Sequence, residues 1–163
     1  MQSISPFLWL DHQAGPAAQH PLSILEGSRA TGVSRYGAGA PAPAGTAMAA
    51  SFELDGAPFE ALDAGPVLRS TEATSCFVRT EAQVDIDRLS EWLTSDGGEP
   101  GRCGWLKNSC GLSWQIVPSI FAELLGDPDR ATTSRVQQPV STMGKIDVRA
   151  LRAAGAGLAH VPE

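Results

Sequence analysis

Basic residues and cysteine are scarce in this chain of 163 residues, and each shortage excludes a class of protein. Only 12 Lys and Arg stand against 18 Asp and Glu, a formal net charge of −6, so we expect no basic surface for nucleic acid or anionic lipid. Three cysteines do not make a disulfide framework, and the spacing of Cys103 and Cys110 is not that of a zinc site. We therefore expect reduced thiols, while a redox role of the Cys103–Cys110 pair stays open.

A long apolar run is also missing. The longest uncharged stretch lies between Arg35 and Glu53, but it is rich in Ala, Gly and Pro and is typical of a loop rather than a membrane span. The first six residues lack the basic start and apolar core of a secretory signal. These features favour a cytoplasmic protein with no membrane and no nucleic-acid partner.

Short strands and frequent turns are predicted in the first part of the chain. The 17 Gly and 12 Pro favour many turns over long helices. Apolar and aromatic runs predict strands over 6–10, 31–36, 48–54 and 58–62, and Asp55-Gly56 predicts a tight hairpin between the last two. A helix is expected over 15–25, although Pro21 should break or kink it.

The same order of elements is predicted a second time. Strands are expected over 74–79, 103–107 and 112–117, with an amphipathic helix over 82–93. Ser119 is expected to cap a following helix, and 146–151 should form a last one. The chain is thus predicted to be α+β, with modules over 4–66 and 72–118 that share a cavity and a C-terminal helical extension over 119–155. We expect a single domain over 1–163.

Three stretches resemble one known family. They are Pro6-Phe7-Leu8-Trp9-Leu10-Asp11, Ser51-Phe52-Glu53-Leu54-Asp55-Gly56, and Cys103-Gly104-Trp105-Leu106-Lys107 with Gly111-Leu112-Ser113-Trp114-Gln115-Ile116-Val117-Pro118. They are similar to the PhnB-like, or 3-demethylubiquinone 3-methyltransferase-like, branch of the glyoxalase/bleomycin-resistance (vicinal oxygen chelate) superfamily. The resemblance implies two βαβββ modules whose curved sheets form half-barrels around a pocket, commonly in a homodimer.

The residues do not favour the methyltransferase activity in this family's name. No strand is followed by a Gly-rich turn and a helix that would hold a nucleotide-like cofactor. The nearest glycine cluster, Gly37-Ala38-Gly39, precedes a proline-rich loop and is typical of a flexible connector. We expect no cofactor.

The resemblance also implies where a metal would bind. The superfamily places its ligands on equivalent strands of the two modules, which here gives Pro6, Glu60, Ser75 and Gln115. Proline has no ligating side chain and serine is a weak donor, whereas a catalytic metal usually takes three protein ligands. We expect no bound metal. The alternative is a divalent-metal lyase, isomerase or dioxygenase with Glu60 as one ligand.

Five residues are the candidates for the site. Glu60 is the best catalytic acid–base candidate, because burial of its side chain on an inward-facing strand would disfavour the charged form. If the strand is turned the other way, Glu60 is only an exposed charge. Trp9 and Trp114 could stack on a ligand or fill the core. Gln115 could offer its amide, and His20 could reach the ligand or belong to a locally rebuilt helix.

The function expected from these candidates is the binding or transformation of a small organic molecule without a metal. A protein that sequesters an antibiotic against its tryptophans is a further alternative. Lys107 and Arg69 are the cations expected nearest a pocket mouth, unless both are solvated surface charges.

Overall fold

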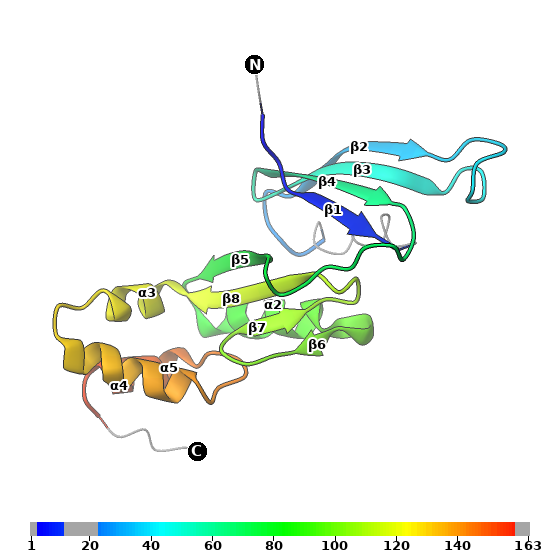
Figure 1. Cartoon of the computed structure of the whole chain (residues 1–163). Coiled ribbons are helices and arrows are strands. Elements are labelled where there is room, and N and C mark those ends of the chain that lie inside the picture. Colours follow the sequence, from blue (N-terminus) through cyan, green and yellow to red (C-terminus); the bar gives the residue numbers. More distant parts are fainter. Residues whose placement is uncertain (1–2, 12–22, 159–163) are drawn as a thin grey trace. The chain divides into compact units, whose positions relative to one another are not determined.

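The computed structural model describes residues 3–11 and 23–158 (Figure 1). The chain divides into two compact units, 1–70 and 71–163, and each is described by itself. Most of the helix predicted over 15–25, with Pro21, lies outside the described residues, and its last three residues form a turn. That the whole chain makes a single domain stays a prediction.

Unit 1 contains one four-stranded mixed sheet, sheet A. Its strands are β1 (Phe7–Leu10), β2 (Arg29–Arg35), β3 (Ala47–Leu54) and β4 (Ala57–Asp63), in the order β1-β4-β3-β2. β1 runs parallel to β4, and the other neighbours are antiparallel. The predicted hairpin joins β3 to β4, where Asp55 and Gly56 have φ angles of 47° and 77°. Two positive φ angles are what a two-residue hairpin turn requires.

The side chains of sheet A alternate between two faces. Ala50, Phe52 and Leu54 on β3 are buried, and Ala61 on β4 is buried on the same side. The residues between them point the other way, because successive strand residues face opposite sides of a sheet. We call this second side the polar face of sheet A; it carries Phe7, Trp9, Ser51, Glu53, Glu60 and Leu62.

Unit 2 contains a second four-stranded mixed sheet, sheet B, with a helix after its first strand. In chain order it has β5 (Ser75–Thr80), α2 (Gln83–Leu93), a short 3₁₀ turn, β6 (Glu99–Pro100), β7 (Trp105–Lys107) and β8 (Ser113–Pro118). The strand order is β5-β8-β7-β6, with β5 parallel to β8. β6 was not among the predicted strands.

The helix α2 covers the apolar side of sheet B through Ile86, Leu89 and Leu93, which are buried (Figure 1). The opposite side is the polar face of sheet B. It carries Ser75, Phe77, Trp105, Lys107, Ser113 and Gln115.

The C-terminal extension consists of α3 (Ser119–Leu125), α4 (Arg130–Val140) and α5 (Val148–Gly155). The sequence did not predict α4. The prediction that Ser119 caps α3 is wrong, because the capping position is held by Pro118 and the Ser119 hydroxyl donates to Glu81 at 2.6 Å. The predicted α+β class, with two four-stranded mixed sheets and helices at the C-terminus, is confirmed.

The extension is packed against the end of β8. Its core combines Val117 of β8 with residues of the extension that are all buried: Val136, Val140, Ile146 and Leu151. The segment 143–148, which we call the strap, also bonds to the loop before β7. The Cys103 N–H donates to the Met143 carbonyl and the Gly104 N–H to the Gly144 carbonyl, both at 2.8 Å. In the described part of the chain, no helix is both long and apolar enough to cross a bilayer.

Candidate functional site

Glu60 lies in the middle of the polar face of sheet A. Phe7 on β1 and Ser51 on β3 are its cross-strand neighbours. The Ser51 hydroxyl donates a hydrogen bond of 2.6 Å to Oε2 of Glu60, so the half-buried carboxylate is held in one orientation. Phe7 is 61% exposed beside it. A fixed carboxylate next to an exposed aromatic ring can accept a hydrogen bond from a small molecule that lies on that ring.

Gln115 holds the corresponding place on the polar face of sheet B. Its cross-strand neighbours are Phe77 on β5 and Trp105 on β7. The Gln115 amide nitrogen donates a hydrogen bond of 2.8 Å to Oγ of Ser75, which fixes the amide and leaves its carbonyl oxygen to accept another bond. Phe77 is 51% exposed.

The two units therefore repeat one arrangement. In each, the fourth strand of the sheet carries a carboxylate or amide, and the parallel edge strand places a phenylalanine in register beside it. The pairs are Phe7 with Glu60 and Phe77 with Gln115. The sequence predicted Glu60 and Gln115 as equivalent residues and named Ser75 only as an implied metal position. Phe7, Phe77 and Ser51 were not among its candidates.

The tryptophans separate into two groups. Trp9 lies on the polar face of sheet A, where its indole N–H donates to the Gly65 carbonyl at 2.9 Å. Trp114 lies on the α2 side of sheet B and is 1% exposed, which matches the core-filling alternative. The tryptophan that shares the polar face of sheet B with Gln115 is Trp105. His20 lies outside the described residues.

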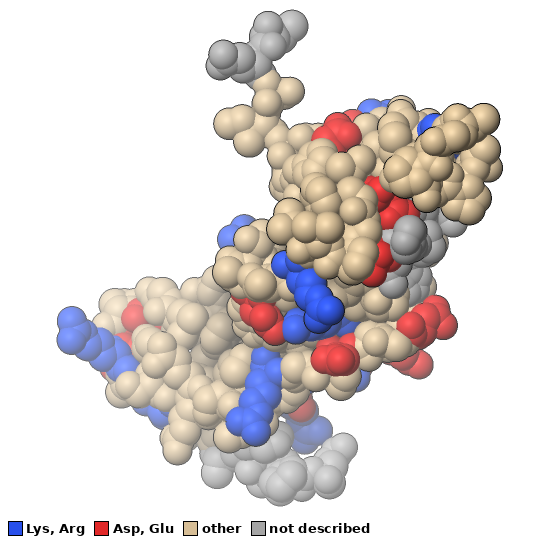
Figure 2. Space-filling model, turned by 45° about the vertical axis from the view of Figure 1, so that its right-hand side comes forward, with Lys and Arg blue, Asp and Glu red and all other residues tan. Residues whose placement is uncertain are grey.

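Two ion pairs border the polar faces. On sheet A, Arg29 donates two hydrogen bonds to Glu53, at 2.8 and 3.1 Å. On sheet B, the Lys107 ammonium lies 2.5 Å from the Glu72 carboxylate. This pairing raises the pKa of Lys107 and lowers the pKa of Glu72. Elsewhere, acidic and basic side chains are interspersed on the surface drawn in Figure 2, most of which is uncharged.

The residues at the implied metal positions do not fit a catalytic divalent metal. Glu60 supplies one carboxylate, Gln115 and Ser75 supply neutral groups that are hydrogen-bonded to each other, and Pro6 supplies none. A catalytic site usually has three protein ligands with nitrogen, thiolate or carboxylate donors. Among the described residues, no group of three or more His, Cys, Asp and Glu could hold a metal ion.

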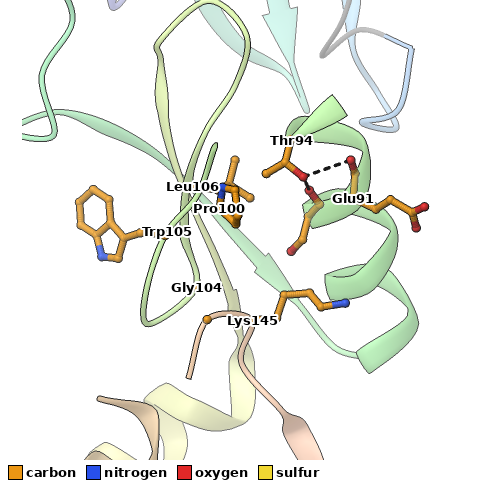
Figure 3. A pocket seen from close by; sticks show the side chains of 10 residues that line it. Glu91, Thr94, Pro100, Gly104, Trp105, Leu106 and Lys145 are labelled. Atoms are coloured by element: carbon orange, nitrogen blue, oxygen red, sulfur yellow. Dashed lines mark hydrogen bonds between the residues drawn. The ribbon is translucent and has the colours of Figure 1, made fainter. Parts of the chain in front are cut away.

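A separate cavity of about 240 Å³ lies in unit 2, between α2, the β6–β7 hairpin and the strap. Leu106, Pro100 and Thr94 line it, and the Lys145 side chain reaches toward α2 at its lower end, whereas the Trp105 ring points away from α2 (Figure 3). Within unit 2 the cavity therefore lies on the opposite side of sheet B from Gln115. Glu60, Trp9, Trp114 and Gln115, the predicted site residues that the structure describes, do not line it.

Comparison with solved structures supports this architecture. A PhnB protein from Bacillus cereus is 28% identical, and the match covers 72% of this chain and 100% of that chain with a TM-score of 0.67. A protein from Pseudomonas aeruginosa shares the fold at 18% identity, with 72% and 98% of the two chains covered and a TM-score of 0.55. No protein of curated function matches the chain by sequence.

A family model described as 3-demethylubiquinone-9 3-methyltransferase matches residues 2–117. The match spans both sheets, including Glu60 and Gln115, and ends at Val117, two residues before the C-terminal extension begins at Ser119. The predicted family is confirmed: this chain belongs to the PhnB-like, 3-demethylubiquinone-9 3-methyltransferase family and adds a three-helix extension to its fold.

Proposed function

We propose that this chain binds a small organic molecule against the polar faces of its sheets, with no metal ion. The observation that carries the proposal is the repeated pair of Phe7 with Glu60 and Phe77 with Gln115. A single exposed aromatic residue is unremarkable on a protein surface. Two at equivalent positions, each beside a polar group that a serine holds in place, form a repeated binding element.

Glu60 and Gln115 have different roles in this proposal. The Glu60 carboxylate accepts hydrogen bonds only, so it selects an N–H or O–H group of the ligand. Gln115 uses its N–H₂ group on Ser75 and presents its carbonyl oxygen. If the bound molecule is transformed, Glu60 is the group that takes the proton, since it is the carboxylate of the repeated pair.

A fragment screen by thermal shift, followed by calorimetric titration of the compounds found, tests the proposal. Glu60→Gln should weaken the binding of compounds held on sheet A, and Gln115→Ala that of compounds held on sheet B, by about tenfold each, the effect of losing one hydrogen bond that involves a charged or well-oriented group. Glu53→Gln is the matched control, because it removes a carboxylate from the same face that is already paired with Arg29.

The proposal fails if the compounds found bind equally well to Glu60→Gln, Gln115→Ala and the wild type. It also fails if Phe7→Ala and Phe77→Ala leave binding unchanged while abolishing self-association in sedimentation velocity, because the rings would then belong to a protein interface. The homodimer, the cavity shared by the modules and the cytoplasmic location stay predictions.

A further inference from the structure

One buried hydroxyl on the polar face of sheet B lacks a partner. Ser113 on β8 is 0% exposed, and among the described residues its Oγ has no hydrogen-bond partner. A buried polar group without a partner is costly, and each one in a native protein needs an explanation, such as a water, an ion or a functional role. Thr80 and Trp114 carry the other two such groups among the described residues, both on the α2 side of sheet B. The Ser113 side chain lies on the same side of β8 as Gln115, two residues further along.

Ser113 stands in a row of polar side chains that crosses three strands. Ser75 on β5 is its register partner on one side, and Lys107 on β7 is its partner on the other. Lys107 and Ser113 are directly opposite on antiparallel strands, where Cβ atoms are about 4.5–5.5 Å apart. The row therefore places two serine side chains and one lysine side chain next to one another on the same face.

The ammonium group of this row is already paired with a carboxylate. Glu72, in the turn before β5, lies 2.5 Å from the Lys107 Nζ atom, and the Glu72 side chain is 62% exposed. Exposed ion pairs of this kind are weak, so a ligand can exchange with Glu72 at little cost. An ammonium group has three donors, and a carboxylate has two oxygens, so one ligand group can contact both Lys107 and Ser113.

We propose that Ser75, Ser113 and Lys107 form a subsite for the carboxylate of a small aromatic ligand, and that Glu72 pairs with its Lys107 when the ligand is absent. An aromatic ligand is favoured because Phe77 and Trp105 lie in the next row of the same face. The inference rests on the proposed function and adds the chemical class of the ligand.

Benzoate and benzamide are the probes, since they differ mainly in charge. Binding is followed by tryptophan fluorescence, with Trp105→Phe identifying the signal of that residue. Benzoate should quench Trp105, and benzamide should bind about tenfold more weakly, as expected when a charged hydrogen bond is lost.

Substitutions of Lys107 and of Glu72 should change the affinity for benzoate in opposite directions. Lys107→Met should weaken benzoate binding about tenfold, with Lys107→Arg restoring most of it. Glu72→Gln should strengthen benzoate binding about two- to fivefold, because it removes a weak internal competitor. Lys145→Met and Asp87→Asn are the matched controls. Each breaks the ion pair of 2.6 Å between Lys145 and Asp87 elsewhere in unit 2, and neither should change the affinity for benzoate.

Ser113→Ala gives an independent test. Removing an unpaired buried hydroxyl should leave the melting temperature unchanged or raise it, whereas benzoate binding should become weaker. If Ser113 had only a structural role, its substitution would not weaken benzoate binding while leaving the melting temperature unchanged or higher.

The subsite is overturned if benzoate does not quench Trp105, if benzamide binds as well as benzoate, or if Glu72→Gln fails to strengthen binding. Equal losses in Lys107→Met and Lys145→Met would also overturn it, because they indicate a general effect of charge or binding in the other cavity. None of these results decides the proposed function, which is judged separately by titrating Glu60→Gln and Gln115→Ala with the compounds found in the fragment screen.

Discussion

Substituting Gly104 tests how the extension is joined to sheet B. Gly104 has φ +80°, and a Cβ atom at this position would lie 2.6 Å from the Ile116 carbonyl oxygen and 3.1 Å from Cδ1 of Ile146. The first contact is with backbone and cannot relax by a rotamer change. Gly104→Ala therefore combines backbone strain, about 1–2 kcal/mol, with overpacking, about 1–3 kcal/mol.

Gly111→Ala is the matched control. Gly111 has φ +75°, but a Cβ atom there meets nothing within 4 Å, so it should cost only the backbone strain of about 1–2 kcal/mol. Urea unfolding of both variants, followed by circular dichroism, should thus show a further loss of about 1–3 kcal/mol for Gly104→Ala. Equal free energies of unfolding would refute the close approach of Gly104, Ile116 and Ile146.

Three other predictions concern thiol titration, the extension and metal content. Burial raises the pKa of the Cys76 thiol from 9.0 to about 11, so the unfolded thiol loses its proton at lower pH than the folded one. The free energy of unfolding should then fall by up to about 3 kcal/mol between pH 9 and 11, and a Cys76→Ala variant that shows the same fall would contradict this. A chain ending at Pro118 exposes Val117 and should lose about 1.5–3 kcal/mol of stability in urea unfolding, while unchanged stability would mean that the extension packs only loosely. Elemental analysis of protein soaked in Mn, Fe, Ni and Zn should find no stoichiometric metal, and one equivalent lost in Glu60→Ala would favour the metal-dependent alternative.

Local patterns were enough to predict most strands. The alternation over 48–54 reflects one buried face, and β3 is found there. The mostly apolar run over 112–117 is buried on both sides, and β8 is found there. Asp55-Gly56 predicted its hairpin because few other residue pairs tolerate two positive φ angles. In contrast, β6 has only two residues, one of them Pro100, and it is defined by pairing with β7 rather than by its own sequence.

The helix α4 shows why the extension was harder to predict. It contains Pro139 and a polar first turn, which argue against a helix by propensity alone. The buried Val136 and Val140 hold it in place through contacts with the strap and α5, which lie further along the chain. Tertiary packing therefore decides this element.

The site residues could be predicted in part. Trp114 and Gln115 are adjacent in a strand, so they must point to opposite faces, and both could not have lined one site. The register between strands decides on which side of sheet B Trp105 lies, and it brings Ser51 within hydrogen-bond distance of Glu60. No local sequence pattern contains this register.

The strap also sets an order for folding during synthesis. Unit 1 has all the strands of its sheet once Asp63 has been made. The loop before β7 gains its partners Met143 and Gly144 only some 40 residues after it is itself synthesised. Because domains generally fold as units from the N-terminus during translation, unit 1 is expected to be complete while the second sheet still has an unfinished loop and an uncovered Val117. In a nascent chain, this late closure makes unit 2 the part that most depends on protection from aggregation.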